Sequence, residues 1–254
     1  GQARWHTSDP ATSSARSRFP GVLDLTATLT RADATRVHRY LPLHLGEPVR
    51  RYLREAVHAG RAEQVDFRVR GDLWDMPFNT PGSQGEFRIA AALRGVDFDY
   101  VPPYLQSEGD RPWPGLRQVN GELLLDRAAL RLSGLQAGLQ AAPSVRLGSA
   151  SIAIDDLAHT STLVVHAHGQ GAANELLGFM RDSPLNAMTG EALAQAQADG
   201  SAGLEFRLRL PLYAVQQTRV DGTVQFAGND LRIAPDAPLL GRASGVLNFS
   251  ETGF

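Results

Sequence analysis

The chain contains no cysteine among its 254 residues. Disulfides, thiol nucleophiles and thiolate metal sites are therefore excluded. It also contains no lysine, so all 25 basic residues are arginine. No run approaches the roughly 18 apolar residues that a membrane-spanning helix needs, and no secretory signal peptide is recognisable. The formal net charge of −2 gives no broad field that would attract nucleic acid, so no nucleic-acid partner is expected.

The hydrophobic fraction is 43%, which is enough for a packed core, and the apolar residues follow a strand pattern over most of the chain. Residues 21–30 alternate between apolar and polar side chains, as a strand with one buried face does. Short turns between such segments predict an antiparallel meander. We expect strands at about 21–30, 65–73, 85–100, 119–125, 129–132, 145–154, 163–168, 204–212, 220–226, 231–233 and 245–249.

Helices are predicted in four places, between or after these strands. Asp33 is expected to cap a helix that ends near Leu41. A second helix spans about 48–59, with Gly60 as its closing residue. Further helices are expected at about 174–180, capped by Asn174, and at about 190–198. The predicted fold class is thus α+β and rich in strands, with short helices beside an extended sheet.

The sequence repeats itself. "VDFRVR" at 65–70 matches "LEFRLR" at 204–209, and at the same spacing Val37, Tyr40 and Leu41 align with Leu176, Phe179 and Met180. This predicts two strand–helix–helix–strand repeats, at about 21–133 and 160–234, whose helices cover part of the sheet. A second internal sequence match pairs residues 119–132 with residues 220–233. Residues 1–20 are rich in Ser, Thr and Pro and are interpreted as a disordered linker or tag remnant, with a single β-rich fragment over 21–254.

Two histidines suggest a metal site at first sight. His166 and His168 share one face of a strand, with alpha carbons roughly 6.5 Å apart, and His159 is a possible third zinc ligand. No acidic partner stands at a recognisable motif spacing, so a solvated strand face is the favoured interpretation. A metal hydrolase that uses these histidines remains the third alternative, and no metal is expected.

Other patterns typical of enzymes are weak. "GQGAAN" at 169–174 resembles a phosphate-binding loop but lacks the third glycine and the acidic residue about 20 positions later. The pairs Asp97–Asp99 and Asp155–Asp156 are ordinary for solvated strands, and no G-x-S-x-G motif occurs. Arginines 68, 70, 207 and 209 are expected to solvate the outer face, with phosphate contact as a lesser alternative. We therefore expect no catalytic residues, no cofactor and no enzymatic activity.

Several stretches together resemble the periplasmic AsmA-like family, and most closely its YhdP branch. They are "RYLP" at 39–42, "YLREAVHAGRAEQVDFRVRGDLWDMPF" at 52–78, "GEFRIAAALRGVDFDYVPPY" at 85–104, "WPGLRQVNGELLLDRAALRL" at 113–132 and "LLGFMRDSPL" at 176–185. The resemblance covers about residues 21–254. It implies a fragment of a longer envelope protein that is held by an inner-membrane helix outside this fragment.

The resemblance also implies a function. It predicts a curved sheet whose apolar groove carries phospholipid acyl chains between the inner and outer membranes, supporting the outer-membrane barrier. The one-faced strands agree, since a sheet must cover its apolar side with something. The alternative is a structural or assembly module whose helices seal the groove and which docks other envelope proteins. Expected partners are acyl chains, the rest of the same chain and other envelope proteins. The groove candidates are Val65, Phe67, Val69, Phe87, Ile89, Leu204, Phe206, Leu208 and Leu210.

Overall fold

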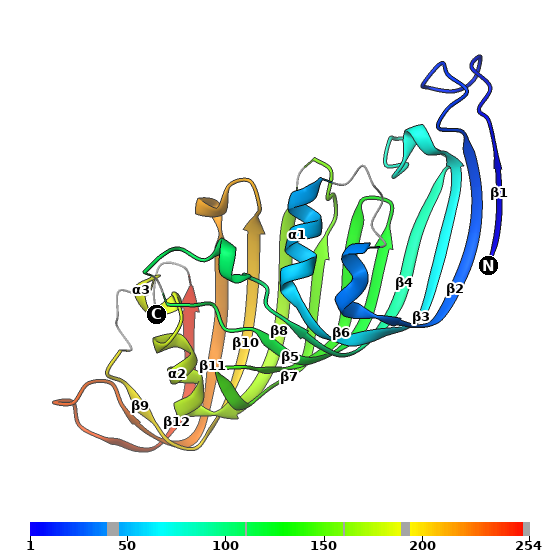
Figure 1. Ribbon diagram of the computed structural model, residues 1–254. Coiled ribbons are helices and arrows are strands. Elements are labelled where there is room, and N and C mark those ends of the chain that lie inside the picture. The colour runs from blue at the N-terminus through cyan, green and yellow to red at the C-terminus, as the bar shows by residue number, and fades with distance from the viewer. Residues whose placement is uncertain (40–45, 110, 160, 189–193, 251–254) are drawn as a thin grey trace.

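The computed structural model describes residues 1–39, 46–109, 111–159, 161–188 and 194–250. Within these ranges the chain forms one antiparallel sheet of 12 strands that is not closed. Each strand pairs with its neighbours in sequence, except that the short β9 pairs with β11 and leaves β8 beside β10. The predicted meander is confirmed. The two edges of the sheet are β1 and β12 (Figure 1).

The strands are β1 (Gln2–His6), β2 (Val22–Asp33), β3 (Val57–Asp72), β4 (Glu86–Phe98), β5 (Leu116–Asp126), β6 (Ala129–Leu139), β7 (Ala142–Ile154), β8 (Thr162–Ala172), β9 (Gln197–Ala198), β10 (Ser201–Pro211), β11 (Arg219–Arg232) and β12 (Leu240–Ser250). The helical segments are η1 (Ala34–Arg39), α1 (Glu47–Ala56), η2 (Leu73–Asp75), η3 (Pro103–Leu105), α2 (Ala173–Arg181), α3 (Leu185–Met188) and η4 (Val215–Gln217). The order β2–η1–α1–β3 recurs as β8–α2–α3–β10 with β9 inserted, although α3 precedes the helix that was predicted at about 190–198.

Four sequence predictions need correction. Residues 2–6 form β1, paired with β2, where a disordered linker was expected. Gly60 lies inside β3, since α1 ends at Ala56 and the strand follows at once; its φ of +102° allows the backbone of Val96 to pass close by. Residues 194–198 hold a turn and β9 instead of helix, and 189–193 lie outside the described residues. The two strands expected at 220–226 and 231–233 are one strand, β11.

The second internal sequence match has no structural counterpart. Residues 119–132 fold back as the β5–β6 hairpin, which turns at Arg127 with φ of +54°. Residues 220–233 instead continue through a bulge at Gly228 and Asn229 within β11. The Asn229 side chain holds that bulge, because its Nδ2 donates to the carbonyl oxygens of Asp199 and Ser201 at 2.7 and 3.0 Å.

Bulges also bend the sheet across five successive strands. The pairing register shifts between Glu63 and Asp66 in β3, and the same kind of shift recurs in each of β4 to β7. Such bulges place one extra residue in a strand, bend it and increase its twist. Four of the extra residues adopt left-handed φ values near +50°, namely Gln64, Gly95, Gln118 and Gly134. The bulges form a crease that helps to give the sheet the strong curvature seen in Figure 1.

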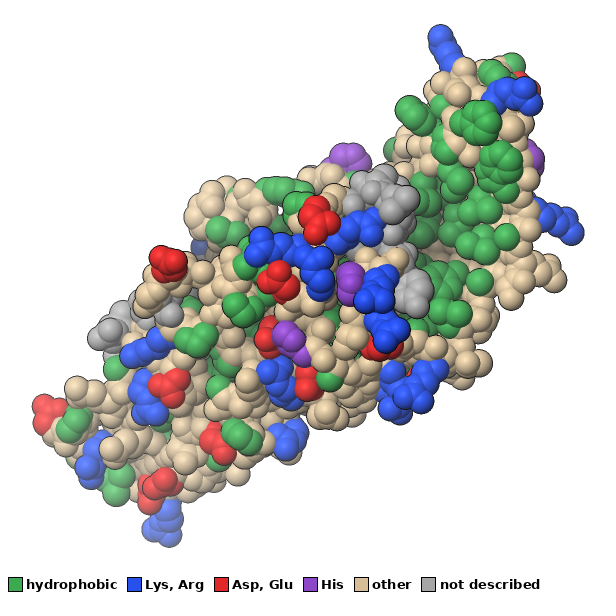
Figure 2. Space-filling view, in the orientation of Figure 1, with side chains coloured by type: hydrophobic (Ala, Val, Ile, Leu, Met, Phe, Trp, Pro, Cys, Tyr) green, Lys and Arg blue, Asp and Glu red, His purple; other side chains and the backbone are tan. Residues whose placement is uncertain are grey.

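The helices lie on the concave side of this curved sheet (Figure 1). In α1, Tyr52 packs edge-on against Phe98 of β4, with ring centroids 6.3 Å apart. In η1, Ala34 packs against the core. Asp33 caps this helix as predicted, since its carboxylate accepts from the amide of Thr35, the second residue of η1, at 3.0 Å. Figure 2 shows hydrophobic side chains gathered on the same side of the molecule over the β1–β4 end, beyond these helices.

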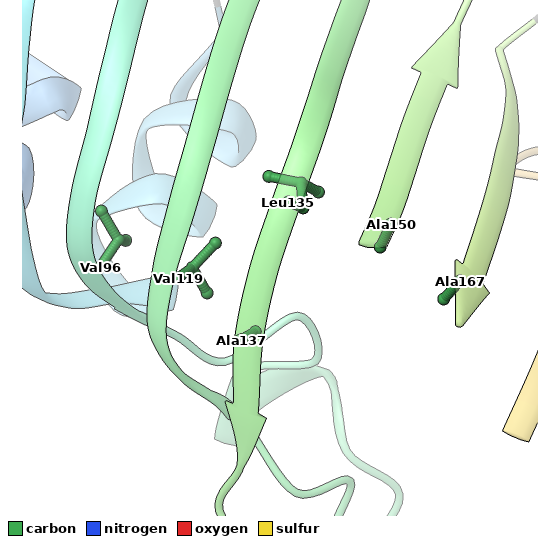
Figure 3. Close-up of a cluster of buried hydrophobic side chains, with 6 residues drawn as sticks. All are labelled: Val96, Val119, Leu135, Ala137, Ala150 and Ala167. Carbon is green, nitrogen blue, oxygen red and sulfur yellow. The ribbon is translucent and has the colours of Figure 1, made fainter. Parts of the chain in front are cut away.

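The main core lies on the concave side of the middle strands. Its buried members come one or two from each of β4 to β8: Val96, Val119, Leu135, Ala137, Ala150 and Ala167 (Figure 3). Small residues dominate toward β7 and β8. Two smaller clusters lie under α2, one at the β6–β7 turn and one beside β9 and β10. The core is therefore thin, one layer of side chains between a sheet and short helical covers.

Candidate functional site

The concave face of the sheet carries continuous rows of apolar side chains that run across the strands. In the pairing register, Phe67 of β3 stands opposite Ile89 of β4, and each next strand places another apolar residue in the same row. The row continues through Leu125, Leu130, Ile154, Leu163 and Leu210. A second row runs through Leu123, Leu132, Ile152, Val165, Leu208 and Val220. The apolar face is thus unbroken from β3 to β11.

All nine predicted groove residues lie on this apolar face, because the register of β2 to β4 and of β8 to β10 gives them one parity. Val65 and Val69 are buried, at 5% and 8% exposed. The other seven are half-buried: Phe67, Phe87, Ile89, Leu204, Phe206, Leu208 and Leu210. Their placement on one face follows from the register, while their role in holding a ligand stays a prediction.

The opposite face is polar at the alternate positions. Arg68, between Phe67 and Val69, makes ion pairs with Asp24 of β2 and Glu86 of β4 across two ladders. These contacts raise the pKa of the Arg68 guanidinium, chiefly through its hydrogen bond to Asp24. Arg207 lies next to Phe206 and pairs with Glu205 at 3.4 Å. Adjacent residues in a strand, such as Phe206 and Arg207, therefore lie on opposite faces of the sheet.

The apolar face is covered unequally along the sheet. Toward β1–β4 its side chains reach the surface in the space-filling view (Figure 2), and Leu29 of β2 is 38% exposed. At the other end, α2 places Leu176 and Phe179 against Val145 and its neighbours, and Leu176 and Leu177 against the cluster around Ala202. Helices thus cover part of the apolar face, and toward β1–β4, beyond α1 and η1, the face is open to solvent.

The predicted cover residues are only partly accounted for. Leu176 and Phe179 pack as expected, and Met180 and Val37 are half-buried in α2 and η1. Tyr40 and Leu41 lie outside the described residues. Sequence reasoning missed Tyr52 of α1, whose hydroxyl donates to the carbonyl oxygen of Tyr100 at 3.1 Å. Its apolar neighbours at helical spacing were visible, but its partner in a distant loop was not.

The glycine-rich segment that precedes α2 is a packing feature. Gly171 belongs to β8, and a β-carbon there would stand 2.6 Å from the α-carbon of Val145. The helix begins at Ala173 after Ala172, so the prediction of Asn174 as its cap, with Gly171 in the turn, is wrong. Instead the Ala173 amide donates to the Gly200 carbonyl at 2.8 Å. Glu175 accepts from the Ser144 amide at 2.7 Å and ties α2 to β7.

His166 and His168 project from the polar, convex face. Their cross-strand partners are Ser151 and Arg207 for the first, and Ser149 and Glu205 for the second. His159 lies in the turn before β8, where it pairs with Asp156 at 2.9 Å. In the described part of the chain, no three His, Asp or Glu side chains gather closely enough to hold a metal ion.

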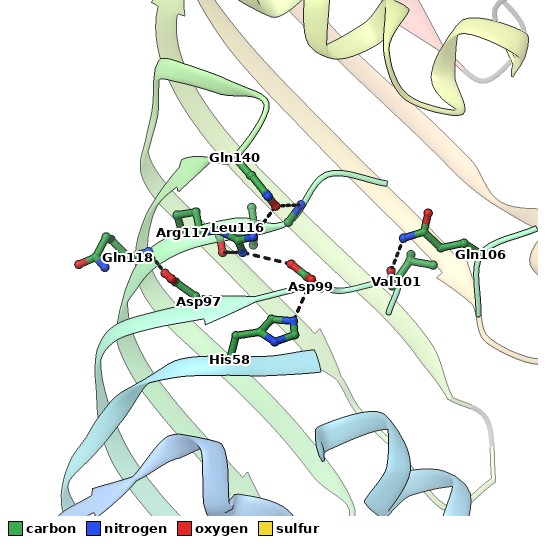
Figure 4. A network of polar contacts seen from close by, with 10 residues as sticks. His58, Asp97, Asp99, Val101, Gln106, Leu116, Arg117, Gln118 and Gln140 are labelled. Carbon is green, nitrogen blue, oxygen red and sulfur yellow. Dashed lines mark hydrogen bonds and ion pairs between the residues drawn. The ribbon is translucent and has the colours of Figure 1, made fainter. Parts of the chain in front are cut away.

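The acidic pairs serve as local anchors. Asp99 accepts from Arg117 at 3.1 Å and pairs with His58 at 2.8 Å, linking β3, β4 and β5 (Figure 4). Arg117 also donates to Gln140 at the end of β6. Asp97 accepts from the Gln118 amide at 2.9 Å, at the left-handed residue of the β5 bulge. This network holds together one end of each of the four strands β3 to β6.

The described residues therefore offer an apolar surface that is bordered by polar anchors. Comparison with known proteins gives one match: a family model described as YhdP protein covers residues 3–254. No curated protein and no solved structure matches the chain. No helix in the described ranges is long and apolar enough to cross a membrane.

Proposed function

Since this chain belongs to the YhdP family, we propose that it carries phospholipid along the concave apolar face of its sheet, between the inner and outer membranes. The family consists of bacterial envelope proteins of the lipid-transport type, located in the periplasm and not known as enzymes. In this proposal the acyl chains lie on the apolar rows and the headgroups stay in water. Transport of this kind supports the barrier of the outer membrane.

The observation that carries the proposal is the unbroken apolar face with an open end. The row from Phe67 to Leu210 crosses seven strands, β3 to β8 and β10, without a charged side chain, and beyond α1 and η1 the apolar side chains of the β1–β4 end reach the surface. An exposed apolar surface that runs continuously across a sheet usually marks a binding surface. A ligand that slides must meet the same chemistry at each step, and these rows provide it.

The energetics suit a carrier. Burying a lipid tail contributes about 0.8 kcal/mol per CH₂, so an acyl chain is held on apolar surface without any specific polar contact. The half-buried state of Phe67 and Phe206 leaves area on each side chain for such contact. Retention of this kind needs only the area and the continuity of an apolar surface.

The test is site-specific photo-crosslinking in bacterial cells that make the protein within its full-length chain. A benzophenone amino acid replaces Phe67 or Phe206 on the apolar face, and Arg68 or Arg207 in matched controls on the polar face. Phospholipid labelled with radioactive phosphate should be captured at the first two positions and not at the controls. Equal capture on both faces, or none on the apolar face, would remove the basis for lipid carriage.

A structural or assembly role is the second candidate, favoured by the roof that α1 and α2 place over part of the apolar face. In that case the crosslinker at Phe67 or Phe206 would capture protein. Discrete protein adducts without lipid at these two positions would identify a module that docks envelope proteins or other parts of its own chain.

A further inference from the structure

The turn between β10 and β11 is unusually apolar for a solvent-exposed hairpin tip. Leu212, Tyr213 and Val215 are 42%, 80% and 61% exposed. No charged residue occurs between Arg209 and Arg219. Neither Tyr213 nor Val215 belongs to the sheet, so this tip is separate from the apolar face described above. Exposed apolar side chains gathered on one loop indicate contact with something other than water.

Two other turns along the same edge of the sheet carry charged side chains. The β5–β6 turn holds Asp126 and Arg127, and the β7–β8 turn holds Asp155, Asp156 and His159. An apolar tip is therefore a property of the β10–β11 hairpin and not of every turn at this edge. The carboxylates of the β7–β8 turn would stay in water, which limits the contact to a protruding tip.

The backbone of the tip makes its own hydrogen bonds. The amide of Ala214 donates to the Pro211 carbonyl at 3.1 Å, and that of Gln217 donates to the Ala214 carbonyl at 2.8 Å. The Leu212 amide donates to Ser161 at 2.9 Å, and the Thr218 amide to Val215 at 3.1 Å. Pairing of these four amides lowers the cost of moving the tip out of water, because buried unpaired amides are costly.

Two arginines stand at the base of the same hairpin. Arg209 and Arg219 are directly opposite each other in the β10–β11 ladder, and both are exposed. A phosphate that lies between two guanidiniums accepts strong charge-assisted hydrogen bonds from both. The hairpin thus presents apolar groups at its tip, followed by a pair of cations, which is the order of layers in a phospholipid surface.

We propose that the β10–β11 tip inserts into the interfacial layer of a phospholipid bilayer, with Leu212, Tyr213 and Val215 among the upper acyl carbons and Arg209 and Arg219 at the phosphates. Tyrosine suits this depth, since its ring is apolar and its hydroxyl reaches water. Two further aromatic side chains are exposed near this edge of the sheet, Phe19 at 63% and Trp74 at 61%. The contact is independent of lipid carriage on the concave face.

The absence of native cysteine makes the test direct. In the whole chain, Ala214→Cys carries an environment-sensitive fluorophore that reports the polarity around the β10–β11 tip. Ala141→Cys, in the β6–β7 turn, carries the same label and reports the polarity at the opposite edge of the sheet. The probes are vesicles of phosphatidylethanolamine and phosphatidylglycerol, with and without brominated acyl chains. The label at position 214 should brighten and be quenched by bromine, and the label at 141 should not change.

Variants separate the parts of the tip. L212S/Y213S/V215S should lower vesicle partitioning by about tenfold or more, whereas Ile233→Ser, which removes a side chain 60% exposed at the opposite edge, should not. R209Q/R219Q should weaken binding to these vesicles more than to phosphatidylcholine vesicles. Vesicle binding with an unquenched label at 214, or no vesicle binding, would overturn the proposal. Lipid crosslinking at Phe67 should persist in the triple serine variant, so the two proposals fail separately.

Discussion

The Tyr52 hydroxyl donates a hydrogen bond to the main-chain carbonyl of Tyr100 and so joins α1 to the segment that follows β4. Burial, with a smaller contribution from Tyr104, raises the pKa of Tyr52 to about 12. The pKa of an unfolded tyrosine is ~10. The folded state therefore binds this proton more tightly, and the stability it contributes is complete below pH ~10 and is lost as the pH rises toward ~12.

Tyr52→Phe should lower the free energy of unfolding by about 1 kcal/mol at neutral pH, because one hydrogen bond is lost. Its stability should also fall less steeply above pH ~10 than that of the natural chain. Urea unfolding at a series of pH values measures both effects. Burial raises the pKa of Tyr100 as well, so some alkaline loss should remain; an identical slope in both proteins would contradict the assignment.

Asn229→Ala should be strongly destabilising, by about 2–4 kcal/mol, because it removes the partners of buried backbone groups. Asn229 is 1% exposed and its side chain makes three hydrogen bonds, one of them accepted from the Ala227 amide. The free energy of unfolding in urea is the readout. Asn248→Ala, at an exposed position of β12, is the control and should change little.

Leu208→Asp places a charge in the second apolar row, between Val165 and Val220. We expect either a large loss of stability or, if the chain stays folded, loss of lipid crosslinking at the neighbouring Phe206. Circular dichroism and the crosslinking assay together distinguish the two results. A folded variant with lipid capture at the natural level would argue against ligand contact on this face.

Phe179→Ala tests how firmly α2 covers the sheet. A fully buried phenylalanine would cost about 3–5 kcal/mol, but Phe179 is only half-buried, so we expect a cost below that range. The measurement is again unfolding in urea, with Asn174→Ala, an exposed position on the same helix, as the control. A cost within the full range would indicate a sealed core instead of a loosely seated cover.

The double change of His166 and His168 to alanine should leave bound metal and lipid capture as they were. Both side chains are exposed on the convex face, away from the apolar rows. Metal analysis of the purified chain and the Phe67 crosslink provide the readouts. Stoichiometric zinc that disappears in the double variant would restore the metal hydrolase alternative.

The alternating pattern of residues 21–30 and 65–70 was enough to predict the strands and the shared apolar face, because a period of two reports one-sided burial directly. The bulges were not predictable, since a bulge is defined by the partner strand. Residues 119–132 and 220–233 share a spacing, yet one is a hairpin and the other a single strand. The difference depends on Asn229 reaching Asp199 and Ser201, two residues that local sequence does not connect to it.

The shared apolar face was predictable as a set of residues, but the uneven cover of that face was not. The parity of Phe67 and Phe206 follows from the strand pattern alone. Which part of the face is covered depends on where α1 and α2 lie. Even the start of α2 differs from the predicted cap at Asn174, and there the amides of Ala172 and Ala173 donate to Ser144 and Gly200. Such contacts join segments that are distant in sequence and leave no local signal.

Pairing between sequence neighbours gives the sheet an unusual response to load. Tension applied between β1 and β12 would act across the ladders, so each interstrand boundary carries the same force and the weakest one opens first. One boundary can part while the next stays closed, because in the described part of the chain each ladder joins strands that lie side by side in the sheet. A sheet with this topology therefore opens one ladder at a time under tension. The separated strands can pair again from either side when the tension between its two edges is released.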